Sequence, residues 1–177
     1  MADVLLKIPT KSLVLPVAVP GSGKTTLLKQ VHVPGWRHGP DDVRRTMFGD
    51  VSIQGHGDLV HTAAQAMLRC RLADGLPSAY DATNVTPKTR KVLVDLARWY
   101  GYTVVALVSE VPQELALLRN RLRTEGVVPE HVIERMWKQK ESAISLIYTE
   151  VDKVYHFHED TTRFRIEWTD LDPVAVD

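Results

Sequence analysis

The residues best suited to chemistry form a glycine-rich turn, P-G-S-G-K-T-T, at positions 20–26. Its two glycines can adopt positive φ values, which lets successive backbone N–H groups converge on an anion. The lysine adds a point charge for the β- and γ-phosphates of a nucleotide, and the threonine after it can ligate Mg²⁺. We therefore predict a site for ATP or another nucleoside triphosphate, with Mg²⁺ as cofactor, built from Pro20, Gly21, Ser22, Gly23, Lys24, Thr25 and Thr26.

The segments on either side of this turn agree with a phosphate-binding loop. Residues 13–19 form an apolar run that predicts a strand, and residues 24–31 predict a helix whose positive dipole end adds to an anion site. Ala18 stands where the full pattern has its first glycine, but it still ends the strand. Because Pro16 cannot donate a hydrogen bond, we expect a bulge in this strand or a gap on one side of it.

The rest of the chain alternates between strand and helix patterns. Strands are predicted at 4–8, 13–19, 78–82, 102–109, 154–157 and 164–168, and helices at 24–31, from 41 or 42 onward, 58–73, 87–100, 112–123 and 129–150. The run 102–109 is continuously apolar, which is typical of a strand buried in a parallel sheet. The pattern therefore predicts an α/β fold, a parallel sheet flanked by helices on both faces.

Carboxylates lie at two places where such a fold would bring them to the phosphates. Asp41 and Asp42 follow the loop-rich segment after the first helix, and Asp81 lies at the end of the strand predicted at 78–82. Ligands of parallel sheets bind at the carboxyl ends of the strands. One carboxylate could therefore deprotonate an attacking hydroxyl while the other holds Mg²⁺ through water. Helix N-capping at 41–42 and an Asx-type turn at 81–84 are the alternatives.

Arginines form two clusters. Arg119 and Arg123 are four residues apart near the end of a predicted helix, so we expect them on one face, before a loop that could act as a lid. There they could grip the phosphates, or they could form a solvated basic face. The second cluster, with Trp36 beside it, would suit an acceptor that carries phosphate, and consists of Arg37, His38, Arg44 and Arg45. A lone tryptophan more often packs than stacks on a base.

Length and amino-acid composition limit the possible partners, domain number and compartment of the protein. Of the 177 residues, Lys and Arg together number 22, as do Asp and Glu, so no bulk charge favours nucleic acid. The length fits a single domain, 1–177. Cys70, the sole cysteine, excludes an intramolecular disulfide and is predicted to lie in the core. No apolar run approaches the ~20 residues of a membrane span, and no signal peptide is evident, so we expect a cytoplasmic protein.

Four motifs in this order resemble the kinase module of bacteriophage and bacterial polynucleotide 5′-kinases. They are P-G-S-G-K-T-T, P-D-D-V-R, Y-D-A-T-N, and R-N-R-L-R followed by V-P-E, within about residues 13–150. The resemblance implies a P-loop kinase fold with a four- or five-stranded parallel sheet and a helical lid at about 119–135. It also implies transfer of the NTP γ-phosphoryl to the 5′-OH end of DNA or RNA, as in nucleic acid end repair.

The resemblance also assigns roles by position. Asp41 matches the general base for the 5′-OH, Arg44 the contact to the 3′-phosphate of the acceptor, and Asp81 the aspartate near the metal-bound waters. The implied catalytic residues are Asp41, Lys24 and Arg123, with Arg119 and Arg123 as lid arginines on the nucleotide. The implied acceptor contacts are Asp41, Arg44 and Asp81; Thr25 would bind Mg²⁺ directly, and Asp41 and Asp81 through water.

Two other functions remain open on the sequence. The same fold could phosphorylate a small-molecule hydroxyl on a nucleoside, sugar or antibiotic. It could also serve as a regulatory NTPase, although the chain has no N-K-x-D base-reading motif. Pro40 precedes Asp41 where the family often has a polar residue or arginine. The D-L-D-P-V at 170–174 is similar to a phosphatase nucleophile motif, but three residues follow it, and we expect a stand-alone kinase module.

Overall fold

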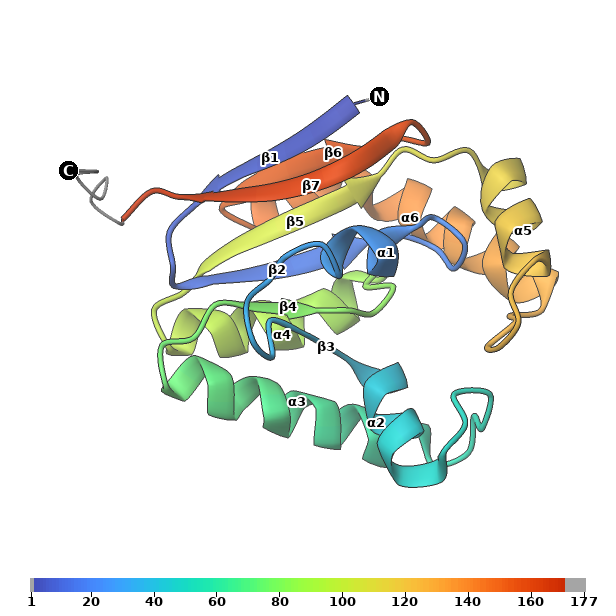
Figure 1. Cartoon of the computed structure of the whole chain (residues 1–177), viewed down its shortest axis with the longest axis horizontal. Helices are drawn as coiled ribbons and strands as arrows, with labels where there is room; N and C mark the ends of the chain where they lie inside the picture. Colours follow the sequence, from blue (N-terminus) through green and yellow to red (C-terminus); the bar gives the residue numbers. More distant parts are fainter. Residues whose placement is uncertain (1, 171–177) are drawn as a thin grey trace.

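The computed structural model describes residues 2–170, which form a five-stranded parallel sheet, a two-stranded parallel sheet and six helices (Figure 1). The large sheet has the order β3-β4-β2-β5-β6, and β1 pairs with β7. The elements are β1 (Ala2–Ile8), β2 (Ser12–Val17), α1 (Lys24–Leu28), β3 (Arg37–His38), α2 (Pro40–Phe48), α3 (Gly57–Ala73), β4 (Ser78–Tyr80), α4 (Pro87–Trp99), β5 (Thr103–Ser109), α5 (Gln113–Arg121), α6 (Glu130–Glu150), β6 (Lys153–Phe157) and β7 (Thr161–Trp168).

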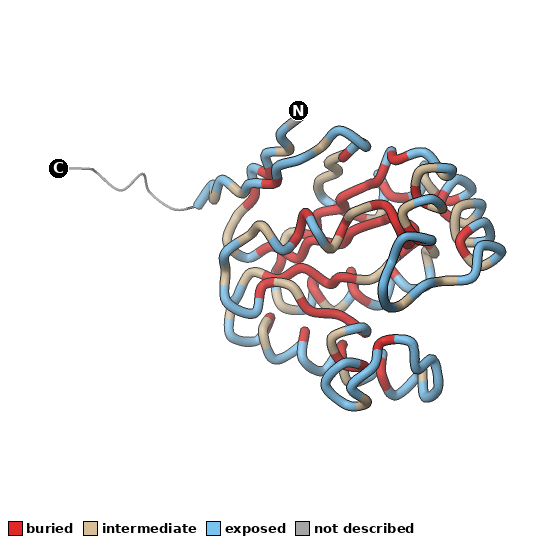
Figure 2. The backbone as a smooth tube through the Cα atoms, turned by 45° about the vertical axis from the view of Figure 1, so that its right-hand side comes forward, coloured by how far each residue is buried: buried red, intermediate tan, exposed pale blue. Residues whose placement is uncertain are grey.

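The central strands are buried on both faces because successive side chains point to opposite sides of a sheet. In β2, Leu13 and Leu15 pack in one apolar cluster, whereas Val14 packs in the other. The predicted buried strand at 102–109 is confirmed as β5, which pairs in parallel with β2 and β6. Figure 2 shows these strands as the buried centre of the molecule.

Different layers cover the two faces of the sheet. Helices α3, α4 and α6 supply the apolar residues of one face. The other face is covered by α1 and by the β1–β7 ribbon, which runs across the sheet as a separate layer (Figure 1). The predicted strands at 4–8 and 164–168 therefore exist, but they pair with each other in register from Val4↔Phe164 to Ile8↔Trp168. None of the described helices is long and apolar enough to cross a membrane.

Pro16 produces the one-sided gap that the sequence predicts. The N and C=O of one residue point to the same side of a strand, and those of Pro16 face β4. Pairing between β2 and β4 stops at Val14↔Ala79, so no ladder bond needs the missing N–H. The Pro16 carbonyl accepts a hydrogen bond from Asn84 Nδ2 at 2.9 Å instead. Asn84, in the left-handed region at φ 48°, thus joins the ends of β2 and β4.

Several boundaries and one core assignment differ from the sequence-based expectations. Arg37–His38 form β3 within a segment predicted as loop-rich, α1 ends at Leu28 instead of Val31, and β4 ends at Tyr80. Cys70 is exposed, so its prediction as a core residue is wrong. The reason is geometric: the buried stripe of α3 recurs every four residues, and Cys70 points away from it. That stripe consists of Val60, Ala64, Leu68 and Leu72.

The segment between α5 and α6, residues 122–129, is held at its base. The Asn120 side chain donates to the Val128 carbonyl at 2.8 Å and accepts from the Val128 N–H at 3.1 Å. A third apolar cluster, which includes Val19 just before the glycine-rich turn and Ile133 from α6, packs around this base. The chain therefore leaves α5 at Leu122 and returns at Val128 to form a loop, called the lid loop below.

His38 is buried at the end of β3, and burial together with the nearby Arg71 cation lowers its pKa to about 4. Neither ring nitrogen has a hydrogen-bond partner among the described residues. The ring meets Tyr80 edge-on, with centroids 6.0 Å apart. His38 is therefore a neutral core residue at neutral pH, and it adds no positive charge to the basic cluster in which the sequence placed it.

The Asn84 junction gives a first prediction. Asn84→Gly keeps the left-handed backbone comfortable but removes the amide, so the Pro16 carbonyl loses its donor, and we expect a loss of about 1–3 kcal/mol in unfolding free energy. Asn84→Asp, which also lacks the donor, should be at least as destabilised. Urea denaturation measures both. If only the backbone conformation mattered, Asn84→Gly would be neutral or stabilising.

The lowered pKa of His38 gives a second prediction. The unfolded chain binds the proton below about pH 6.5, whereas the folded protein resists protonation until about pH 4. The free energy of unfolding that neutral His38 contributes is fully present above pH 6.5. It falls by on the order of 3 kcal/mol as the pH approaches 4. His38→Phe should flatten this part of the stability–pH profile, measured by urea unfolding. His131→Asn, at an exposed position, should keep the wild-type slope; an unchanged slope in His38→Phe would exclude His38 as its source.

Candidate active site

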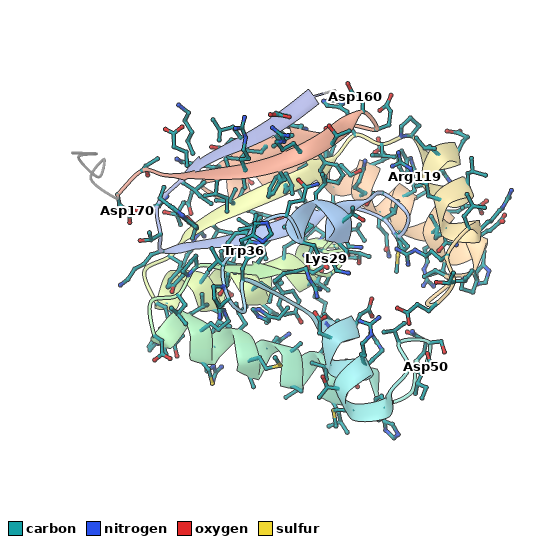
Figure 3. All side chains as sticks on the ribbon, in the orientation of Figure 1. Lys29, Trp36, Asp50, Arg119, Asp160 and Asp170 are labelled. Atoms are coloured by element: carbon teal, nitrogen blue, oxygen red, sulfur yellow. The ribbon has the colours of Figure 1, made fainter. Side chains whose placement is uncertain are left out.

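A cavity of about 730 Å³ opens at the carboxyl ends of β2 and β4. Its walls are the glycine-rich turn with α1, the first turns of α2, the residues after β4, and the lid loop. Figure 3 labels Lys29, which lines it just after α1. Of the sequence-predicted site residues, the cavity wall contains Pro20, Lys24, Thr25, Thr26, Asp41, Arg44, Asp81 and Arg123.

The glycine-rich turn has the geometry of a phosphate cradle. Gly21 and Gly23 have φ values of 86° and 90°, the left-handed conformation that turns backbone N–H groups inward. A Cβ on Gly21 would lie 2.0 Å from the Ala116 carbonyl oxygen, so no other residue fits there. Lys24 is buried at the first position of α1 and lines the cavity. The turn therefore suits the phosphates of a nucleotide.

Helix α2 begins against the end of β4. A Cβ on Gly39, the N-cap residue, would come within 2.2 Å of the Asp81 carbonyl oxygen, so glycine permits this close approach. Asp41 and Asp42 lie in the first turn of α2, and neither side chain caps the helix. The capping alternative for this pair is therefore wrong. Both carboxylates instead lie where the helix dipole favours negative charge.

Arg37 joins the two groups of carboxylates. Its guanidinium donates to both carboxylate oxygens of Asp42, at 2.7 and 2.9 Å, and to Asp81 Oδ2 at 3.1 Å. Burial works to lower the pKa of Arg37, but the hydrogen bonds and charges of Asp42 and Asp81 outweigh it and raise the pKa. The sequence indicated Arg37 only as part of a basic cluster. Arg37 is positioned by a short strand that ends beside α2, and this strand could not be recognised from the sequence.

Asp81 retains one oxygen for a further partner. Its Oδ1 is buried and has no hydrogen-bond partner among the described residues, while its Oδ2 binds Arg37. Asp81 and the Thr25 hydroxyl line the same cavity. No group of three His, Cys, Asp or Glu side chains that could hold a metal alone occurs within residues 2–170. These oxygens fit Mg²⁺, which typically keeps several waters and binds one or two carboxylates together with substrate phosphates.

Asp41 and Arg44 form a pair on the wall opposite the glycine-rich turn. Arg44 Nη1 donates to Asp41 Oδ1 at 2.9 Å; the arginine side chain is 9% exposed and the aspartate side chain 71%. Asp41 therefore presents an accessible carboxylate that a buried guanidinium orients. His61 from α3 lines the cavity nearby, and its pKa is lowered by burial and by Arg44. Nothing in the sequence pattern pointed to His61.

The two lid arginines lie in different cavities, contrary to the expectation of a shared helix face. Helix α5 ends at Arg121, so Arg123 belongs to the lid loop, where it donates to the Gly126 carbonyl at 3.2 Å and lines the main cavity. Arg119 points from α5 toward the turn between β6 and β7, which contains Asp160 (Figure 3), and donates to the Glu159 carbonyl at 3.3 Å. It lines a second cavity of about 410 Å³ beside Gly23.

Two other polar aromatic side chains, Trp36 and His156, lie outside the main cavity. Trp36 is buried against the sheet (Figure 3), and its ring meets Trp168 edge-on at 6.5 Å, so it packs as expected for a lone tryptophan. His156, in β6, contacts Glu110 at 2.8 Å and Tyr148 at 3.1 Å. These contacts account for both of its ring nitrogens.

Comparison with known proteins agrees with the observed fold. A chain of the Pnkp1/Rnl/Hen1 RNA repair complex aligns with a TM-score of 0.68 and 23% identity over 79% of this chain and 46% of that chain. A chain of the PezAT toxin-antitoxin system of Streptococcus pneumoniae gives 0.63 and 16%, over 89% and 72%. A gluconokinase from Sinorhizobium meliloti 1021 gives 0.56 and 18%, over 88% and 86%. No curated protein sequence matches the chain.

These likenesses, at identities below 25%, show the fold alone: an α/β P-loop kinase fold with a five-stranded parallel sheet flanked by helices. This chain spans less than half the length of the RNA repair chain that it resembles. A family model described as an AAA domain matches residues 13–143, which is most of the chain and includes every wall of the main cavity. The chain therefore belongs to this AAA domain family of P-loop proteins.

Proposed function

We propose that the protein is a polynucleotide 5′-hydroxyl kinase, which transfers the γ-phosphoryl group of ATP or another NTP to the 5′-OH end of DNA or RNA. One observation carries the proposal. A single cavity joins the phosphate cradle to a helix wall on which the Asp41 carboxylate lies beside Arg44 and Arg45. A carboxylate can accept the proton of a hydroxyl, and guanidiniums bind the phosphates that a nucleic acid carries.

On the donor side, the cradle would hold the β- and γ-phosphates with backbone N–H groups and Lys24. Arg123 faces the same cavity from the lid loop and would neutralise charge on the γ-phosphoryl group as it moves. Arg119 borders the second cavity beside Gly23, so we assign it to the nucleoside part of the donor. Bound Mg²⁺ would supply charge neutralisation at the phosphate oxygens, held by Thr25 and, through water, by Asp41 and Asp81.

On the acceptor side, Asp41 would position the 5′-OH and take its proton as the phosphoryl group arrives. Arg44 orients this carboxylate through its Nη1. Arg44 also lines the main cavity, so its guanidinium lies beside the space that the acceptor would occupy. We assign it to an acceptor phosphate. Asp42 does not compete for the role of base, because Arg37 holds both of its oxygens.

The likeness to a chain of an RNA repair complex is in keeping with a nucleic acid acceptor, and the likeness to a gluconokinase keeps a small-molecule acceptor as the alternative. The test supplies γ-labelled ATP with a 5′-OH DNA or RNA oligonucleotide, with a nucleoside or gluconate, or with no acceptor. Label on the oligonucleotide supports the proposal. Label only on a small molecule, or only in free phosphate, would exclude it in favour of a small-molecule kinase or an NTPase.

Replacing the proposed base gives a third prediction. Asp41→Asn removes the proton acceptor but keeps the hydrogen bond to Arg44, so we expect kcat to fall about 10²–10⁴-fold. The matched control is Asp58→Asn, at an exposed position of the first turn of α3 that does not line the cavity. Initial rates of label transfer measure both. Near-normal activity in Asp41→Asn would show that another group takes the proton.

The separation of the lid arginines gives a fourth prediction. Arg123→Ala should lower kcat on the order of 10³-fold, because its guanidinium faces the cavity of the transferred group. Arg119→Ala should mainly raise KM for the nucleotide, because this residue borders the second cavity. Steady-state kinetics over a range of ATP concentrations separate the two effects. A larger fall in kcat for Arg119→Ala than for Arg123→Ala would reverse these assignments.

A further inference from the structure

An ion pair crosses the mouth of the main cavity. Arg45 on α2 and Glu125 in the lid loop lie with Nη2 and Oε1 2.5 Å apart, and both residues line the cavity. The lid loop also approaches the residues that follow α2, since a Cβ on Gly126 would lie 3.2 Å from the Val51 side chain. Figure 1 shows α2 and the loop between α5 and α6 on the same side of the sheet. The lid loop thus touches the α2 wall of the cavity, which holds the proposed acceptor residues Asp41 and Arg44.

This pair differs from the other ion pairs of the same wall. Arg37 is fixed by two carboxylates and Arg44 by Asp41, and these arginine side chains are only 20% and 9% exposed. Arg45 and Glu125 are 52% and 61% exposed. Exposed pairs contribute little to stability, so Arg45 is the guanidinium of this wall that most readily exchanges its partner. Its present partner is an anion from the lid.

We propose that Glu125 occupies the place of an acceptor phosphate on Arg45, so that an incoming nucleic acid displaces this carboxylate when it binds. Carboxylate and phosphate oxygens bind guanidinium in the same manner, and phosphate binds at least as well. Glu125 then acts as a built-in competitor that favours acceptors with a phosphate close to the reacting hydroxyl. This inference rests on the proposed function, since it assigns a second phosphate contact to the same acceptor.

The test breaks the pair from each side. Glu125→Gln should lower KM for a 5′-OH oligonucleotide about two- to fivefold and leave KM for ATP unchanged, because the strength of an exposed pair limits the gain. Arg45→Gln should raise KM for the oligonucleotide, and in the double variant Glu125→Gln should have no further effect. The control is Glu130→Gln, which breaks the pair with Arg121 at the same 2.5 Å but outside the cavity.

A catalytic role of the Arg45–Glu125 pair would predict the opposite change in the kinetic constants. If the pair closes the lid for catalysis, Glu125→Gln lowers kcat or raises KM for the oligonucleotide, and the inference is overturned. If the effects of Glu125→Gln and Arg45→Gln on KM for the oligonucleotide simply added in the double variant, the inference would also be overturned.

Calorimetric binding of a nucleoside 3′-monophosphate, against the unphosphorylated nucleoside, separates this inference from the proposed function. Tighter binding of the monophosphate alone by Glu125→Gln supports the inference even if no oligonucleotide is phosphorylated, an outcome that would reject only the proposed function. Equal binding by wild type and variant overturns the inference even if the oligonucleotide is phosphorylated.

Discussion

One guanidinium fixes the geometry of the main cavity. Arg37 lies between the carboxylates of Asp42 and Asp81, which come from α2 and from the end of β4. Without a cation between them, two negative charges would meet in a half-buried site. The Asp81 side chain is only 5% exposed, so loss of its partner would leave a buried charge uncompensated, at a cost of about 3–5 kcal/mol. Through Arg37, the two-residue strand β3 thus links α2 to the end of β4.

This arrangement also separates the roles of two adjacent aspartates. Successive residues of a helix point in directions about 100° apart, so Asp42 reaches back to Arg37 while Asp41 pairs with Arg44 and stays exposed. The proposal of Asp41 as base depends on this division, because a carboxylate with both oxygens held by a guanidinium is a poor proton acceptor. The site thus uses one residue of the pair for structure and leaves the other accessible.

The sequence predicted what local patterns determine. The glycine-rich turn, the buried strand 102–109 and the one-sided gap at Pro16 each follow from a few neighbouring residues, and each is present. It could not predict β3, because two residues carry no periodicity and its pairing with β4 comes from distant parts of the chain. It also could not predict that α5 ends at Arg121, since the Asn120 contacts to Val128 that close the lid loop form only in three dimensions.

The two halves of the proposed site bind phosphate by different physical means. The donor side relies on backbone conformation, where the close packing of Gly21 on Ala116 fixes the cradle before any ligand binds. The acceptor side relies on guanidiniums already paired with carboxylates: Arg44 with Asp41, and Arg45 with Glu125. In the proposed exchange, an acceptor phosphate would replace Glu125 on Arg45, so a chain with 22 basic and 22 acidic residues would need no excess positive charge to bind a polyanion. Such an exchange would gain little from overall charge and would depend on where the displaced Glu125 carboxylate can move, which would make the lid loop part of the proposed acceptor site.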